Sequence, residues 1–300
     1  MPSEMISGPD LGGGYLHQLT VDRDGDRTTF TYHAQDGGSD AGGPPVGPLD
    51  PLGFVHPPSP CQFGGPRCWH RRFLLPFTET PRVRLAYNRL RFVLETMLAQ
   101  VHSGAPVGVD PALAELVRRL RAPAGGPAPD WYVGGSAAAW LLGAKVQPHD
   151  IDLGTTREGV DRLGGALAEF LIEPVATTDW SDGRIVRGAR AFVGTFREGA
   201  RVEWCVSLEP ESAGTVGEWS ERFADVRRIT AQFGGTSVEV TRPEYALVRA
   251  AKKGSVRDLE ALGEIVRRMG ADEELLTALL AGSALGPTQR DAVLRSLVRR

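Results

Sequence analysis

The segment between residues 131 and 156, WYVGGSAAAWLLGAKVQPHDIDLGTT, places a glycine-rich turn close to a pair of carboxylates. The apolar run at 131–133 predicts a short strand, and the turn after it opens a short helix that ends near Gly143. The Asp-Ile-Asp sequence predicts a second strand. Because alternate residues of a strand face the same side, Asp150 and Asp152 project together, roughly 6.5–7 Å apart. This unit restricts the chain to mixed α/β folds that bring a turn and two acids to one place.

The turn and the acid pair have complementary chemistry. Two unpaired carboxylates repel each other, and a divalent cation removes the repulsion; oxygen ligands suit Mg²⁺, which completes its shell with waters and substrate phosphates. Gly134 and Gly135 allow positive φ and close approach of a ligand, backbone N–H groups at the helix start favour phosphate, and the Ser136 hydroxyl adds a donor. The arrangement therefore fits phosphoryl or nucleotidyl transfer.

A third carboxylate is expected, because two-metal transfer uses ions about 3.5–4 Å apart that share several acidic ligands. Glu203 in ARVEWCVSL is the best candidate, since it stands inside a predicted strand between two apolar residues. Glu209, which precedes a proline at the strand end, is a weaker candidate. The alternative for Glu203 is a surface strand residue paired with an arginine.

The sequences GGSAAAWLLG and HDIDLGTT resemble the core motif of the DNA-polymerase-β-type nucleotidyltransferase superfamily. That motif is a Gly-Gly/Ser turn that opens a helix, an Asp-x-Asp pair and a distal strand acid. The pattern is most similar to small bacterial members, which include antibiotic nucleotidyltransferases and the nucleotidyltransferase toxins of type IV toxin–antitoxin systems. The resemblance implies nucleotide binding by Gly134, Gly135 and Ser136, and metal binding and catalysis by Asp150, Asp152 and Glu203.

The resemblance continues into RPEYALVRAAKKGSVRDLEAL, which is similar to a family helix that carries Pro-Glu, a lysine, and Lys-Asp before a leucine. Ala250 stands near the position of the family lysine, and Lys252 and Lys253 follow it, so Lys252 is the candidate nucleotide-binding lysine. The matching residues are Pro243, Glu244, Asp258 and Leu259.

Membership of this superfamily implies two Mg²⁺ ions, an NTP donor such as ATP, transfer of NMP to a nucleophile and release of pyrophosphate. The acceptor stays open: an RNA or tRNA end, a protein, or a small molecule such as an antibiotic. A toxin with a cognate antitoxin is one biological role that the resemblance implies. The basic stretch and the additional N-terminal region favour a macromolecular acceptor.

The total composition sets wider bounds. The chain has 300 residues, of which 41% are hydrophobic, which is enough for one large domain or two modest ones. A formal net charge of −3 indicates no general polyanion binder, and three cysteines argue against a disulfide scaffold. The N-terminus shows no signal-peptide pattern and no run approaches the roughly 18 apolar residues of a membrane span. We therefore expect a soluble, cytoplasmic protein without membrane contact.

Patterning outside the opening segment predicts further elements. Alternation in 15–34 predicts a β-hairpin, and 36–51 has the Gly, Pro and Asp content of a linker. Helical spacing predicts helices over 81–101, 110–121 and 158–171. Two strand hairpins are expected, one around Arg-Glu-Gly at 197–199 and one around Gly-Gly at 234–235. From Pro243 onward we expect helices, with breaks near Gly270 and near the Gly-Pro pair at 286–287.

The predicted fold class is α/β (α+β): a small mixed sheet flanked by helices, with a helical C-terminal part and a loop-rich N-terminal extension. The expected regions are an N-terminal hairpin and Pro/Gly-rich extension at 1–75, a helical segment at 76–125, the catalytic core at 126–242 and a C-terminal helical region at 243–300.

The sequence HPPSPCQFGGPRCWH holds four candidate zinc ligands, His56, Cys61, Cys68 and His70, which could bind Zn²⁺ tetrahedrally. The alternative is a proline-rich loop with two free thiols. Cys205 is expected to be a packed core thiol. A stretch of arginines nearby could follow a phosphate backbone, or could be a solvated helix face. Its members are Arg71, Arg72, Arg82, Arg84, Arg89 and Arg91.

Two other functions remain possible from the sequence. The core could be a catalytically inactive binding module whose N-terminal segment makes a zinc-dependent interaction. A kinase-like phosphotransferase could use the same metal site, and would release ADP in place of pyrophosphate.

Overall fold

The computed structural model describes residues 5–8, 15–24, 27–36, 59–60, 68–75, 84–86, 88–89, 92, 109–121, 130–179, 185–193, 200–207 and 226–298. The strands before residue 76 are described by their backbone alone. The chain divides into two compact units. The first holds Met1–Gly108 with the short segments Glu169–Glu173 and Gly194–Gly199; the second holds Val109–Ala168, Pro174–Val193 and Ala200–Arg300.

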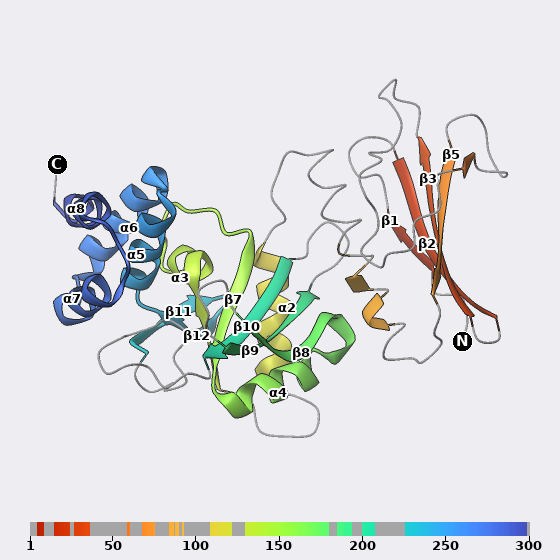
Figure 1. Cartoon of the computed structure of the whole chain (residues 1–300), viewed down its shortest axis with the longest axis horizontal. Helices are drawn as coiled ribbons and strands as arrows, with labels where there is room; N and C mark the ends of the chain where they lie inside the picture. The colour runs from red at the N-terminus through yellow and green to blue at the C-terminus, as the bar shows by residue number, and fades with distance from the viewer. Residues whose placement is uncertain are drawn as a thin grey trace. The chain divides into compact units, whose positions relative to one another are not determined.

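The first unit contains a five-stranded antiparallel sheet with the strand order β1-β2-β3-β5-β4 (Figure 1). The hairpin predicted for 15–34 is confirmed as β2 and β3, which pair along their whole length up to Asp24 and Arg27. The strands are β1 (Met5–Gly8), β2 (Tyr15–Asp24), β3 (Arg27–Asp36), β4 (Ser59–Pro60) and β5 (Cys68–Leu75).

The second unit is built on a seven-stranded mixed sheet with the order β11-β12-β6-β7-β10-β9-β8, which confirms the predicted fold class. The pairs β12/β6 and β7/β10 are parallel, whereas β6/β7, β9/β10 and β11/β12 are antiparallel. The strands are β6 (Trp131–Gly134), β7 (Asp150–Thr155), β8 (Leu171–Asp179), β9 (Ile185–Val193), β10 (Ala200–Ser207), β11 (Arg228–Phe233) and β12 (Thr236–Thr241).

Helices α2 (Val109–Arg121) and α4 (Arg157–Ala166) pack against β7 and β9, and α4 also packs against β10. Alternation along β10 decides which residues meet them: Val202 and Trp204 are fully buried, and the Trp204 indole donates to the Val160 carbonyl of α4 at 3.2 Å. The residues between them must project from the opposite face. The apolar side of β10 thus leaves its charged side facing away from α4.

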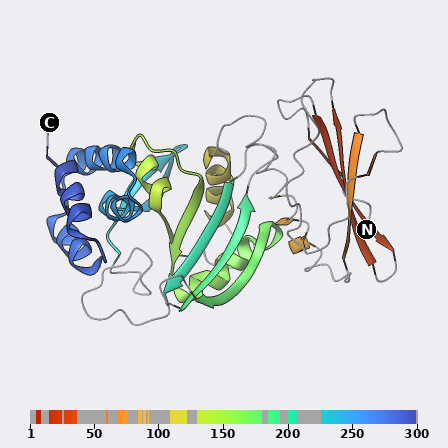
Figure 2. The same cartoon turned by 45° about the horizontal axis from the view of Figure 1, so that its top comes forward.

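The C-terminal helices gather beside α3 (Gly135–Leu141), which contacts α5 as well as β6, β7 and β12 (Figures 1 and 2). Their common core includes Leu247, Leu262, Val266 and Val293, all nearly inaccessible to solvent. This arrangement brings the first turns of α3 and the body of α5 to the same end of the sheet. The helices are α5 (Pro243–Lys253), α6 (Val256–Met269), α7 (Glu273–Gly282) and α8 (Pro287–Ser296).

The predicted helix over 158–171 is too long. The helix α4 ends at Ala166, a short 3₁₀ turn follows at Ala168–Phe170, and Leu171 begins β8. Gly164 and Gly165 weaken the end of the helix, since glycine lowers helix stability. The helix over 110–121 and the Gly-Gly hairpin are confirmed.

Several predictions fall on residues outside the described ranges. The helix predicted over 81–101 is described only at 84–86, 88–89 and 92, where it is helical. Of the candidate zinc ligands, His56 and Cys61 lie outside the described residues. Cys68 and His70 belong to β5, which is described by its backbone alone. Zinc binding, the linker and the domain boundaries therefore stay predictions.

Candidate active site

Three carboxylates meet on one face of the central sheet. Asp150 and Asp152 lie on β7, and the parallel register with β10 sets Glu203 directly beside Asp152. Paired residues on adjacent strands project to the same face. One carboxylate oxygen from each of the three lies within 4.8 Å of the others, which suits a divalent cation. We call these three residues the carboxylate cluster; the sequence predicted all of its members.

The glycine turn lies against this cluster. Gly134 at the end of β6 pairs with Asp152 across the antiparallel β6/β7 register, and Gly135 begins α3 with φ +62°. A Cβ on Gly135 would stand 2.7 Å from Asp152 Oδ2, closer than side chains tolerate. Glycine at this position is therefore required both for the backbone conformation and for the space beside Asp152. Ser136 follows on the exposed side of α3.

Each carboxylate of the cluster is held by an arginine. Arg201 donates to Asp150 Oδ2 at 2.5 Å and lies 3.4 Å from Glu203 Oε2. Arg249 on α5 donates to Asp152 Oδ2 at 3.2 Å, and Arg190 on β9 donates to Glu203 Oε1 at 2.9 Å. The pairing of a strand glutamate with an arginine, which the sequence left open as an alternative for Glu203, is therefore also present.

The electrostatics of Arg201 reflect its central position. Burial alone would lower the pKa of this guanidinium, but the hydrogen bond to Asp150 and the charges of Glu203 and Asp152 outweigh it and raise the pKa above its ordinary value. Arg201 is therefore a permanent positive charge between the carboxylates. It stands two residues before Glu203 on β10, so alternation along the strand places both side chains on the cluster face.

A cavity of about 920 Å³ opens beside the cluster and the turn. Its walls come from helices α3, α5 and α6, from strands β7 and β10, and from residues 145–149, which precede β7. Among the described lining residues, the cations are Lys145, Arg201, Arg249, Lys253 and Arg257, and the carboxylates are Asp150, Asp152, Glu203 and Asp258. Cationic groups and candidate metal ligands thus share one space large enough for a nucleotide.

The structure brings most of the predicted site residues to this cavity. Gly135, Ser136 and the carboxylate cluster line it, and Gly134 is buried directly before the turn. Lys252 is exposed on α5 and is not among the described lining residues, whereas its neighbour Lys253 is. Nucleotide binding by Lys252 stays a prediction.

Sequence reasoning missed the cations that come from several elements. Arg249 is the clearest example: it precedes Ala250, which stands near the position of the family lysine, and its guanidinium reaches Asp152 from α5. A search for any cation within one residue of that position would have found it. Arg257 and Lys145 have no such signal, because only the packing of α6 and of the segment before β7 brings them to the cavity.

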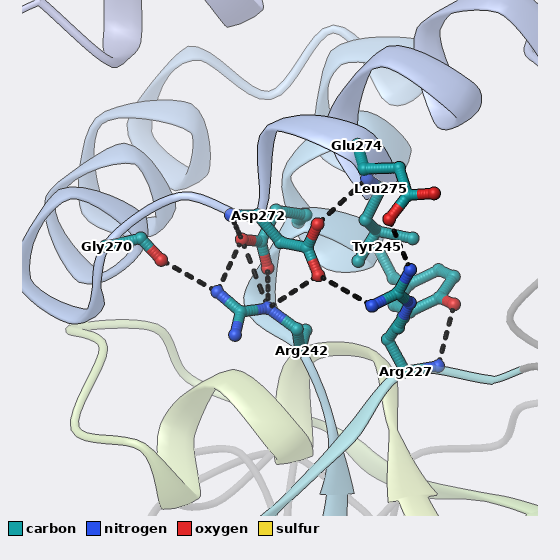
Figure 3. Close-up of polar contacts among 8 residues, drawn as sticks. Arg227, Arg242, Tyr245, Gly270, Asp272, Glu274 and Leu275 are labelled. Carbon is teal, nitrogen blue, oxygen red and sulfur yellow. Dashed lines mark hydrogen bonds and ion pairs between the residues drawn. The ribbon is translucent and has the colours of Figure 1, made fainter.

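A second acid–arginine cluster fixes the start of α5 (Figure 3). Glu244 is fully buried; it accepts from Arg242 Nη2 at 2.9 Å and from the backbone N–H of Asp272 at 2.8 Å. Arg242 also donates to the Gly270 carbonyl at 2.7 Å, and Glu244 raises its pKa above the ordinary value despite burial. We call these contacts the Glu244 network; it ties the junction of β12 and α5 to the loop between α6 and α7.

The network continues toward β11. Arg227 lies 3.7 Å from the Asp272 carboxylate and donates to Glu274 at 2.7 Å, and its backbone N–H donates to the Tyr245 hydroxyl (Figure 3). Because α5 also carries Arg249 and Lys253, contacts that hold the start of this helix help to position the backbone from which two cations of the cavity extend.

The mixed sheet, the glycine turn and the carboxylate cluster are the features expected of a nucleotidyltransferase. Residues 125–249, which span β6 to α5, match the family model of aminoglycoside-2''-adenylyltransferase. The match covers 125 of the 300 residues and supports membership of the nucleotidyltransferase superfamily.

Solved structures with similarity to this chain include a protein from Thermotoga maritima described as a nucleotidyltransferase. It is 19% identical, with a TM-score of 0.38 over 56% of this chain and 99% of that one. An antigenic nucleotidyltransferase-like protein from Paracoccidioides brasiliensis is 17% identical, with a TM-score of 0.33 over 63% of this chain and 95% of that one. No curated protein matches the chain. Within the described residues, no helix is long and apolar enough to cross a membrane.

Proposed function

We propose that this protein transfers NMP from an NTP to an acceptor nucleophile and releases pyrophosphate. The observation that carries the proposal is the convergence of Asp150, Asp152 and Glu203 within 4.8 Å, beside a cavity that also presents the glycine turn. Three carboxylates at this distance provide the oxygen ligands that Mg²⁺ prefers, and two ions is the number that the superfamily resemblance implies.

The residues have distinct roles in this reaction. The carboxylate cluster would hold the metal, which when bound would supply positive charge to neutralise and orient the triphosphate. The turn at Gly135 and Ser136 contacts the phosphates, and Lys253 adds a positive charge from α5. The acceptor oxygen bonds to the α-phosphorus as the bond from that phosphorus to the bridging oxygen breaks. Glu203 helps to remove the acceptor's proton, which passes to solvent.

The charges of the cavity favour an anionic or neutral acceptor, such as an RNA or tRNA end or a protein hydroxyl. Once the carboxylate cluster binds metal, Asp258 is the one remaining carboxylate among the described lining residues, and it already accepts from Ser255 Oγ at 2.6 Å. Lys145 and Arg257 line the same cavity, in addition to the Lys253 assigned to the phosphates. A polycationic aminoglycoside would meet mainly positive charge in this part of the site.

Transfer of label from the α-phosphate tests the proposal. The full chain is incubated with each of the four α-³²P NTPs, including ATP, in Mg²⁺, with total RNA, a protein lysate or an aminoglycoside panel. We expect labelled macromolecule and released pyrophosphate with wild type, and neither product with an Asp150→Asn/Asp152→Asn variant. Absence of transfer with every NTP and acceptor would contradict the proposal.

The remaining possibilities give different results in the same assay. In a parallel reaction with γ-³²P ATP, transfer of label to the acceptor with release of ADP would identify a phosphotransferase. Labelled aminoglycoside alone would contradict the acceptor class proposed here. A toxin role follows only if transfer to RNA or protein arrests growth and a second gene product, the cognate antitoxin, prevents it.

A further inference from the structure

The guanidinium of Arg201 lies where the carboxylate cluster is expected to hold a cation. It is 2.5 Å from Asp150 and 3.4 Å from Glu203, so it bridges two of the three carboxylates, one on each parallel strand. Arg201 also lines the cavity. A single arginine therefore neutralises the same oxygens that a divalent metal would use.

We propose that Arg201 is a positioning residue that competes with the metal: its guanidinium holds Asp150 and Glu203 together without an ion and must leave them when an ion binds. This inference rests on metal binding by the carboxylate cluster, as in the proposed function. A divalent ion at about 2.0–2.1 Å from these carboxylates would place two positive charges against the same groups, and the repulsion between the ion and the guanidinium favours displacement of Arg201.

The hydrogen bonding of Arg201 shows that this contact is incompletely satisfied. Its Nε is enclosed, yet among the described residues it has no hydrogen-bond partner. A buried donor without an acceptor is unfavourable, so the ion-free arrangement lacks part of the stabilisation that a fully bonded arginine would give. A metal ion can therefore displace this guanidinium from the carboxylates at a low cost in lost hydrogen bonds. The Glu244 carboxylate differs, because it accepts hydrogen bonds from both a guanidinium and a backbone N–H.

Arg190 provides a matched control. It pairs with the same glutamate, at 2.9 Å from Glu203 Oε1, but it comes from β9 and is not among the described residues that line the cavity. Loss of either arginine removes one positive charge beside Glu203, and only loss of Arg201 removes the group that bridges to Asp150. The two variants therefore separate competition at the metal position from a general change in charge.

The test is direct titration of the full chain with Mn²⁺ alone, followed by electron paramagnetic resonance, at near-physiological salt. Arg201→Gln is expected to bind Mn²⁺ about tenfold more tightly than wild type, because a charge-assisted contact no longer has to break. Arg190→Gln is expected to change the affinity less than about threefold. In EDTA, Arg201→Gln should unfold at a lower temperature than wild type, since the cluster loses its internal cation.

Arg201→Lys keeps the charge on a single ammonium group and should bind Mn²⁺ with an affinity between those of wild type and Arg201→Gln. It also serves if the glutamine variant does not fold. Equal affinity of wild type and both Arg201 variants, or equal tightening by Arg190→Gln, would overturn the competition and leave the proposed function standing. Absence of Mn²⁺ binding in every variant would overturn both.

Discussion

The carboxylate cluster and the Glu244 network are both made of acids and arginines, yet they differ in what they leave accessible. The side chains of Asp150, Asp152 and Glu203 keep 27%, 20% and 21% of their surface exposed and face a cavity. Glu244 has no exposed surface and accepts from a guanidinium and from a backbone N–H. An ion pair by itself therefore does not indicate function in this protein.

The two clusters differ in the number of carboxylates that converge and in the donors and cations that balance their negative charge. The cluster brings three carboxylates together on one face of two adjacent parallel strands, where their charges repel each other unless cations are present. In the Glu244 network one buried carboxylate is surrounded by donors, so its charge serves to join β12, α5 and the α6–α7 loop. The first cluster is arranged to receive a ligand, and the second to fix a helix.

The largest expected effect is on activity, from a change in the carboxylate cluster. Asp152→Asn should lower NMP transfer by roughly a thousandfold or more, because a metal ligand worth several kcal/mol of transition-state stabilisation is lost. The thermal midpoint should stay close to that of wild type, since one of three like charges is removed. Label transfer and a thermal melt check the two parts; a variant that is unfolded at assay temperature would contradict the contrast.

Glu244→Gln should show the opposite pattern. The free energy of unfolding is expected to fall by about 3 kcal/mol, because the partly buried Arg242 loses its nearest carboxylate and keeps only the Gly270 carbonyl and the Asp272 carboxylate, which is 4.0 Å away. Urea denaturation measures the loss. The Mn²⁺ affinity of the folded protein should change less than about threefold. A variant that is as stable as wild type but binds Mn²⁺ weakly would contradict the structural role assigned to Glu244.

Gly135 tests the link between the turn and the cluster. Gly135→Ala should cost about 1–2 kcal/mol of stability because of its positive φ, and should also reduce transfer at least about tenfold because its Cβ meets Asp152 Oδ2. Gly254→Ala is the matched control: φ is +72° and no atom lies within 4 Å of the added Cβ. It should cost similar stability, measured by urea denaturation, and leave transfer rates unchanged.

The smallest expected effect concerns Glu115 and its two arginine partners on α2. Hydrogen bonds from Arg118 and Arg119 hold the pKa of Glu115 at about 2, below its usual 4.5. A lowered folded-state pKa stabilises the protein above pH 4.5, and this contribution is lost as the pH falls toward 2. Because Arg118 is 65% exposed and Glu115 is 28% exposed, solvent screens these ion pairs and the effect should stay below about 1 kcal/mol. Comparing Glu115→Gln with wild type by urea denaturation should show a difference at pH 6 that disappears near pH 2.

The sequence predicted the elements of the site where chemistry and periodicity agree. Asp150 and Asp152 could be placed on one strand face from the spacing alone, and Glu203 from its position between buried neighbours. The turn at Gly135 could be predicted because a positive φ favours glycine. These signals are local, so no knowledge of tertiary packing was needed.

Contacts that depend on packing were not predictable. Arg249 reaches Asp152 from α5, and Arg257 comes from a different helix, so neither has a periodic signal that points to the cavity. The register that sets Arg201 opposite Asp150 is a property of the parallel β7/β10 pair. The early end of α4 also escaped prediction, because the apolar residues that begin β8 fit a helical period as well.

Anomalous scattering from crystals soaked in Mn²⁺ is the most direct test of the account. The account predicts a manganese peak about 2 Å from carboxylate oxygens of Asp150 and Asp152, with Glu203 completing the site and the Arg201 guanidinium moved away. A soak with no peak between these three residues, or a peak elsewhere with the Arg201–Asp150 contact intact, would contradict it.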